Sequence, residues 1–212
     1  MRIQDRRAAG RLLAHVVSRQ DLHDPVVVGL GPGGLAVGAE VAAALGCPLD
    51  ILDVEEFDGG DPLHPARTVG AVSSGGHLLV RPDGLDRAAE QEALRRAAAR
   101  ATRIASVRAG SVSRTGPPSV AWRTLILVDD GTSSRQAIAA AIDLVRAGRP
   151  GRVILAIPIA PQEKVDELNR IAGEVLVGAV ARYIDWFRWH GHPYEDETVP
   201  DDEQIGRLLA VQ

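Results

Sequence analysis

The chain has 212 residues, 45% of them apolar, which is enough to bury the core of one α/β domain. Its formal net charge of −4 and the lack of a long basic run argue against a partner that is nucleic acid or an anionic membrane surface. A single cysteine, Cys47, excludes an internal disulfide, and without a leader-like start or a long apolar run we expect a cytoplasmic protein.

The first part of the chain predicts a βαβ unit. Residues 5–18 are amphipathic and predict a short helix. "PVVVGLGPGG", which starts at Pro25, predicts a buried strand that runs into a glycine loop. A helix over 35–45 and a second strand in "PLDILDVEEF" follow. Two apolar strands of this kind are typical of a parallel sheet covered on both faces.

Residues 58–121 lose this regularity, and we expect them to form an inserted flap or hood. "TVGAVSSGGHLLV" predicts two short strands around a turn, and residues 85–109 predict a long helix. His64 and Arg67 lie in this flap and could reach a ligand when it closes, although a surface loop is the simpler interpretation.

Regular alternation returns at Thr124 and continues to a tail over 181–212. The predicted strands and helices of this part cover 124–128, 134–147, 152–157, 161–172, 174–177 and a last helix capped near Asp201. We therefore expect one α/β domain over 1–212, a doubly wound parallel sheet of about five strands with an inserted flap. Such sheets bind ligands beyond the carboxyl ends of their strands, where the strand order reverses.

The glycine segment allows two interpretations. Gly29, Gly31 and Gly34 have the Gly-x-Gly-x-x-Gly spacing of a dinucleotide-binding loop, with Asp53 at the end of the next strand. A dinucleotide-binding protein is thus one alternative function. A tight strand-to-helix turn in which only glycine fits explains the same residues. The helix before the motif and a second site-like loop in the other half weigh against the dinucleotide.

That second loop lies in "TLILVDDGTSSRQA", where an apolar strand ends in Asp129 and Asp130 and hydroxyl residues precede a helix. Carboxylates can bind a diol, and free N–H groups at a helix N-terminus bind phosphate, so the pattern indicates a sugar-phosphate site. A turn followed by an N-cap favours the same residue types.

This segment resembles the signature of phosphoribosyltransferases of the common α/β type. The N-terminal "DRRAAGRLLA", the segment "VVGLGPGGLAVGAEVA", the flap segment "VGAV" and the acidic last helix are similar to a predicted bacterial subgroup of that family. The resemblance implies binding of phosphoribosyl pyrophosphate (PRPP) or another ribose 5-phosphate ligand with Mg²⁺, and transfer of phosphoribosyl to an acceptor that the sequence does not identify.

The resemblance also assigns the site. Asp129 and Asp130 would bind the ribose hydroxyls and offset cationic charge at the anomeric carbon. The 5′-phosphate would be held by Gly131, Thr132, Ser133, Ser134, Arg135 and Gln136. The pyrophosphate would face Gly31, Pro32, Gly33 and Gly34. Magnesium would be held by the ligand and water, without a protein metal site.

Departures from the family pattern argue against ordinary turnover. The pyrophosphate loop lacks the arginine of the subgroup, and Glu55 and Glu56 replace basic residues. Ser133 stands where purine-salvaging relatives have an aspartate base. Arg135 replaces a loop glycine, and we expect it to block or alter the pocket. A catalytically inactive sensor or assembly subunit of the same fold is therefore an alternative.

Five of the seven aromatic residues lie in the tail: Tyr183, Trp186, Phe187, Trp189 and Tyr194. They could stack on a planar acceptor, but a subunit interface is the favoured interpretation, which would make the protein a homodimer. His190, His192 and the acidic residues after them resemble a metal cluster in composition only, because their spacing matches no ligand pattern.

Overall fold

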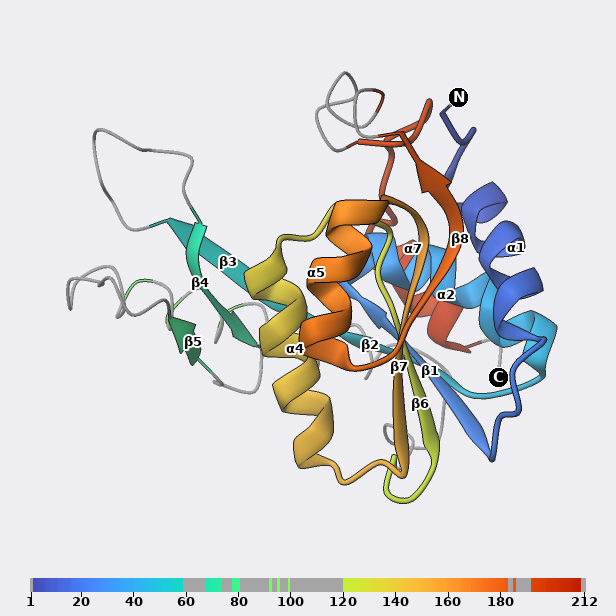
Figure 1. The fold of residues 1–212 in the computed structure, drawn as a ribbon, viewed down its shortest axis with the longest axis horizontal. Helices are drawn as coiled ribbons and strands as arrows, with labels where there is room; N and C mark the ends of the chain where they lie inside the picture. Colours follow the sequence, from blue (N-terminus) through green and yellow to red (C-terminus); the bar gives the residue numbers. More distant parts are fainter. Residues whose placement is uncertain are drawn as a thin grey trace.

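The centre of the molecule is a five-stranded parallel sheet with the strand order β2-β1-β6-β7-β8 (Figure 1). The computed structural model describes residues 2–58, 68–73, 78–80, 120–182, 185 and 192–210, with the single positions 92, 95 and 99. The strands of the central sheet are β1 (Pro25–Leu30), β2 (Leu49–Leu52), β6 (Thr124–Val128), β7 (Arg152–Pro161) and β8 (Val175–Ala181). The predicted doubly wound α/β sheet of about five strands is confirmed.

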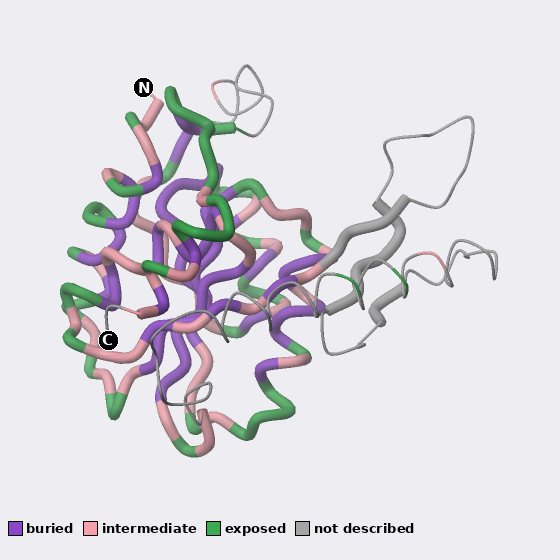
Figure 2. Tube along the Cα trace, turned by 180° about the vertical axis from the view of Figure 1, so that it is seen from behind, coloured by how far each residue is buried: buried purple, intermediate pink, exposed green. Residues whose placement is uncertain are grey.

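Helices cover both faces of this sheet (Figure 1). One face packs against α1 (Arg6–Val17), α2 (Gly31–Leu45) and α7 (Asp202–Ala210), and the other against α4 (Arg135–Ala147) and α5 (Gln162–Ala172). Alternate residues of β6 enter the two cores, with Val128 in the first and Leu127 in the second. This is the period of two that an extended strand imposes, and it leaves most residues of the three inner strands buried, whereas the edge strands β2 and β8 are half-buried (Figure 2).

Two residues of the "DRRAAG" segment, Asp5 and Gly10, have identifiable structural roles. Asp5 caps α1 by accepting a hydrogen bond of 2.7 Å from the N–H of Ala8. Gly10 lies where α1 crosses α2, and a β-carbon there would overlap the carbonyl oxygen of Val37 and the side chain of Glu40. The close approach of the two helices therefore requires glycine at this position.

A second, three-stranded antiparallel sheet has the order β3-β4-β5 and lies beside α4 (Figure 1). Its strands are β3 (Val54–Asp58), β4 (Thr68–Ser73) and β5 (Leu78–Val80), so the two predicted flap strands are present. The single strand expected in "PLDILDVEEF" is wrong, because β2 joins the parallel sheet and β3 the antiparallel one. The predicted flap helix, apart from positions 92, 95 and 99, and both His64 and Arg67 lie outside the described residues.

The expected glycine loop after β1 is replaced by a direct strand-to-helix turn. Helix α2 begins at Gly31, four residues before the predicted start, and Gly31 has a φ of +63° that reverses the chain at once. Pro32 fits the first turn, where a missing N–H costs nothing. Strands β7 and β8 are also longer than predicted, ending at Pro161 and Ala181.

The strand order reverses between β1 and β6. The chain passes from β1 to β2 at one edge, and from β6 through β7 to β8 at the other. The carboxyl ends of β1 and β6 lie side by side, with Gly29 paired to Val128. This is the position at which doubly wound sheets bind their ligands. Among the described helices, none is long and apolar enough to cross a membrane.

Candidate functional site

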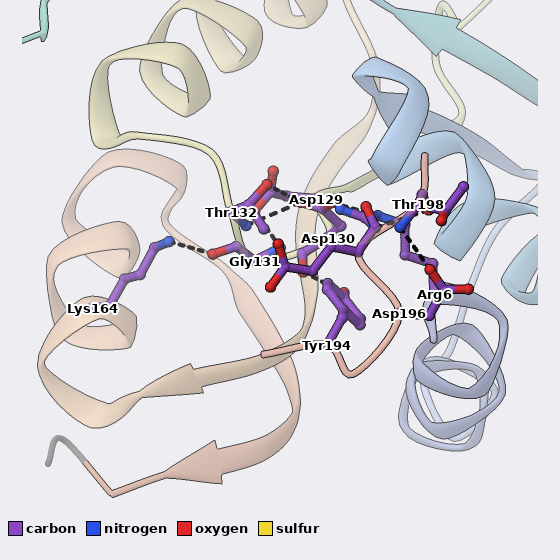
Figure 3. A network of polar contacts seen from close by, with 10 residues as sticks. Arg6, Asp129, Asp130, Gly131, Thr132, Lys164, Tyr194, Asp196 and Thr198 are labelled. Carbon is purple, nitrogen blue, oxygen red and sulfur yellow. Dashed lines mark hydrogen bonds and ion pairs between the residues drawn. The ribbon is translucent and has the colours of Figure 1, made fainter. Parts of the chain in front are cut away.

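Asp129 and Asp130 follow directly after β6 and are almost completely buried, with exposed fractions of 0% and 4% (Figure 3). Successive residues of an extended chain point to opposite faces of a sheet. The two carboxylates accordingly have different partners: Asp130 contacts α1, and Asp129 lies within the field of a lysine on α5. The adjacent acids predicted from sequence thus occupy two different environments.

Both carboxylate oxygens of Asp130 are occupied. Its Oδ2 accepts from the guanidinium of Arg6, with Nε and Nη2 each at 2.8 Å. Its Oδ1 accepts from the backbone N–H of Thr132 at 3.0 Å and from the Thr132 hydroxyl at 2.6 Å. Arg6 is itself only 6% exposed, so the pair is a buried, charge-assisted contact.

Arg6 is held in turn by the C-terminal tail. Its Nη1 donates to the carbonyl oxygens of Glu197 at 2.8 Å and Thr198 at 3.1 Å. Its guanidinium carbon lies 4.6 Å from the centre of the Tyr194 ring, and the Tyr194 hydroxyl donates to the backbone carbonyl of Asp130. Burial raises the pKa of Tyr194, which therefore stays a neutral donor.

Tyr194 corrects part of the prediction for the tail. It is 0% exposed and belongs to the core beside α1 and α2, so the subunit-interface interpretation is wrong for this residue. The other four tail aromatics and His190 lie outside the described residues.

Asp129 has one oxygen in use and one free. Its Oδ2 accepts from the N–H of Gly131 at 2.8 Å, whereas its buried Oδ1 has no hydrogen-bond partner among the residues that the structure describes. Burial and then the charge of Asp130 raise its pKa from 3.8 to about 6, against the opposing effects of Lys164, the Ser133 hydroxyl and the Gly131 N–H. A buried carboxylate oxygen without a partner marks a position where a donor is needed.

The loop after Asp130 opens α4. Ser134 is the N-cap and accepts from the N–H of Ala137 at 3.2 Å. Within the described contacts, the first-turn N–H groups of Arg135 and Gln136 have no acceptor, as expected at a helix start. Thr132 is exposed and Ser133 half-buried, so this anion-binding end of the helix is open to solvent.

Arg135 points away from the loop. Its Nε lies 2.9 Å from Oε1 of Glu167 on α5, and both side chains are about half-exposed. This contact favours a guanidinium held to the side by the neighbouring helix over the expected one that blocks the pocket.

The glycine segment allows the start of α2 to pack closely against the end of β6. Gly31 and Pro32 are partly exposed, but Gly33 and Gly34 are buried. A β-carbon on Gly33 would overlap the Asp130 carboxylate, and one on Gly34 would overlap the carbonyl oxygen of Val128. Both glycines let the start of α2 lie directly against the end of β6, which explains them without a dinucleotide.

Three residues of this site were not among those predicted: Arg6, Tyr194 and Lys164. Lys164 donates to the carbonyl oxygens of Gly131 at 2.8 Å and Ser133 at 3.2 Å (Figure 3). Two of the three carried a signal in the sequence. Arg6 belongs to the family-like "DRRAAG" segment, and Lys164 is the one lysine of the chain. Nothing in the sequence distinguished Tyr194 from the other tail aromatics.

The fold is a doubly wound α/β sheet, and at its switch point lie an acidic strand end and a hydroxyl-rich helix start, the pattern from which the sequence predicted a phosphoribosyltransferase. The family model of the phosphoribosyl transferase domain matches residues 2–198, and the chain belongs to this family. The family predicted from the sequence is confirmed.

Two relatives and one solved structure agree with this membership. Predicted phosphoribosyl transferases from two strains of Mycobacterium tuberculosis are each 30% identical over 207 residues, covering 97% of this chain. The chain spans 46% of the length of these relatives. The crystal structure of the protein TT1426 from Thermus thermophilus is 36% identical, covers 99% of this chain and 98% of that one, and superposes with a TM-score of 0.74.

Replacing Arg6 by Met should lower the free energy of unfolding by about 3–5 kcal/mol, because it leaves the buried Asp130 charge uncompensated. The matched control is Arg7→Met, which removes an exposed guanidinium paired with Glu40 and should change stability little. Urea denaturation of both variants measures the difference. Equal losses would show that the Arg6–Asp130 pair matters no more than a surface pair.

The raised pKa of Asp129 predicts that the free energy of unfolding decreases as the pH rises through its titration range. Between pH 4 and about 6 the native state binds more protons at this group than the unfolded chain, so its contribution becomes less stabilising as pH rises. Relative to Asp129→Asn, the free energy of unfolding of the wild type should fall by on the order of 1–3 kcal/mol across this window. Above about pH 6 the difference should stay constant. Asp143→Asn, which removes an exposed carboxylate of α4, is the control. A constant difference from pH 4 to 8 would refute the prediction.

Proposed function

We propose that this domain binds PRPP, or another ribose 5-phosphate ligand, together with Mg²⁺ at the strand-order reversal. The observation that carries the proposal is that, within the described part of the chain, first-turn N–H groups of α4 without an acceptor follow a buried carboxylate that has one oxygen without a partner. The first suits a phosphate, and the second suits a ribose hydroxyl. Family membership supports the same ligand class.

The proposed roles follow from the contacts. The N–H groups of Arg135 and Gln136, with the hydroxyls of Thr132 and Ser133, would hold the 5′-phosphate. Asp129 would accept from the ribose through Oδ1, which requires the loop above it to shift because the side chain is 0% exposed. Asp130 would act indirectly, by keeping the strand end in place.

The pyrophosphate would lie at the start of α2, where Gly31 and Pro32 are partly exposed and no side chain caps the helix. Mg²⁺ would be held by oxygens of the ligand and by water, and the negative charge of Asp129 at this strand end fits a cation carried in that way without a direct bond to the protein. When bound, Mg²⁺ would neutralise charge on the leaving pyrophosphate. The negative charge of Asp129 would stabilise the cationic centre that forms at the sugar carbon.

Binding without transfer is a second candidate function. It is favoured by the Asp130 carboxylate, whose two oxygens are already bound by Arg6 and Thr132. A sensor needs affinity for the phosphorylated sugar but no stabilisation of a transition state. Pyrophosphate release in the presence of nucleobases separates this candidate from an active transferase.

Millimolar PRPP with Mg²⁺ should raise the melting temperature of the wild type, because a ligand that binds only the folded state stabilises it by mass action. Asp129→Asn should lose most of this rise while remaining folded. Asp143→Asn is again the matched control and should keep the full rise. An undiminished rise in Asp129→Asn would place the ligand elsewhere, and no rise in the wild type would refute the proposed function.

Arg135→Gly should change PRPP affinity less than about threefold, because the guanidinium pairs with Glu167 and a surface pair of this kind contributes little. Calorimetry of the wild type and Arg135→Gly measures the change. A gain of tenfold or more would mean that Arg135 enters the pocket in solution. A loss of that size would mean that it contacts the phosphate directly.

A further inference from the structure

The one lysine of the chain lies on α5 and points at the loop between β6 and α4 (Figure 3). Its ammonium donates to the carbonyl oxygens of Gly131 at 2.8 Å and Ser133 at 3.2 Å, and the side chain is partly buried. The first turn of α5 thus supplies a cation to the loop that follows β6.

These two contacts fix the peptide planes of the loop. In a trans peptide group the N–H and the C=O point in opposite directions. Carbonyls held towards Lys164 therefore turn the following N–H groups, of Thr132 and Ser134, away from α5. The Thr132 N–H does point the other way, to Oδ1 of Asp130. Lys164 in this way fixes the loop conformation in which the N–H groups of Gly131 and Thr132 point to the buried carboxylates of Asp129 and Asp130.

Lys164 also sets the charge balance beneath the loop. Asp129 lies among Asp130, Lys164, the Ser133 hydroxyl and the Gly131 N–H, with Arg6 and Tyr194 on the far side of Asp130. Arg6 compensates Asp130 directly, and Lys164 is the cation whose charge lowers the pKa of Asp129. Removing the ammonium would leave Asp129 with the neighbouring carboxylate and no opposing cation of its own.

We propose that Lys164 is a positioning residue for the anion site: it holds the carbonyl groups of loop 131–134, and with them the start of α4, in place and supplies positive potential behind the bound phosphate. The part of this inference that concerns the bound phosphate rests on the proposed function. Its effect on the loop and on Asp129 does not require a ligand.

The first experiment uses the ligand-free protein. Carbon-13 NMR of aspartate carboxyls, with the Asp129 signal assigned through Asp129→Asn, follows the titration of Asp129 in the wild type, Lys164→Met, Lys164→Arg and Arg170→Met. Arg170 is an exposed cation on the same helix, so its removal is a matched change of charge away from the loop. The midpoint should move upward in Lys164→Met and stay near the wild-type value in the other two variants. An unchanged midpoint in Lys164→Met overturns the inference.

The second experiment measures affinity for PRPP with Mg²⁺ by calorimetry at several pH values. Lys164→Met should weaken binding about tenfold or more at pH 7.5, the loss expected for charge-assisted hydrogen bonds, and Lys164→Arg should recover most of it. If Lys164→Met does not fold, Lys164→Gln keeps a donor and serves in its place. Wild-type affinity in the Met or Gln variant overturns the inference. Failure of the wild type to bind refutes the proposed function alone, because the NMR titration still tests Lys164.

Discussion

The buried ion pair between Arg6 and Asp130 is the contact on which the site depends. It joins the first helix to the end of β6, and through the carbonyls of Glu197 and Thr198 it joins both to the C-terminal tail. A buried pair gains little net stability over apolar packing, but loss of one partner is costly. Three segments far apart in sequence must therefore be in place together before the acidic strand end is correctly formed.

This pair also explains why small residues surround it. Gly33 lies against the Asp130 carboxylate, and Gly10 lets α1 approach α2 closely enough for Arg6 to reach it. The glycines that resemble a dinucleotide fingerprint have a related but separate role: Gly29 and Gly34 let backbone segments at the β1–α2 turn pack closely, and Gly31 takes the positive φ of that turn. The same spacing can arise from two different physical demands, and the neighbours of each missing β-carbon distinguish them.

Asp129 and Asp130 have different roles because different cations act on them. Arg6 forms an ion pair with Asp130, whereas Lys164 acts on Asp129 through its charge and, among the described residues, Oδ1 of Asp129 has no hydrogen-bond partner. Burial and the charge of Asp130 accordingly raise the pKa of Asp129 to about 6. Glu167, one turn along α5 from Lys164, keeps Arg135 out of the loop. Helix α5 thus shapes an anion site in which it contributes no backbone N–H.

The sequence by itself determined the parallel sheet, the strand over 124–128, the Ser134 helix start and the family, because these follow from local periodicity, capping and contiguous motifs. It did not determine where α2 begins, how "PLDILDVEEF" divides between two sheets, or the partners of Asp130, Asp129 and Arg135. Those partners lie 124 residues from Asp130 for Arg6 and on the following helix for Arg135. Contacts between distant segments leave no periodic trace in the chain, so only the packed tertiary structure decides which charge compensates which.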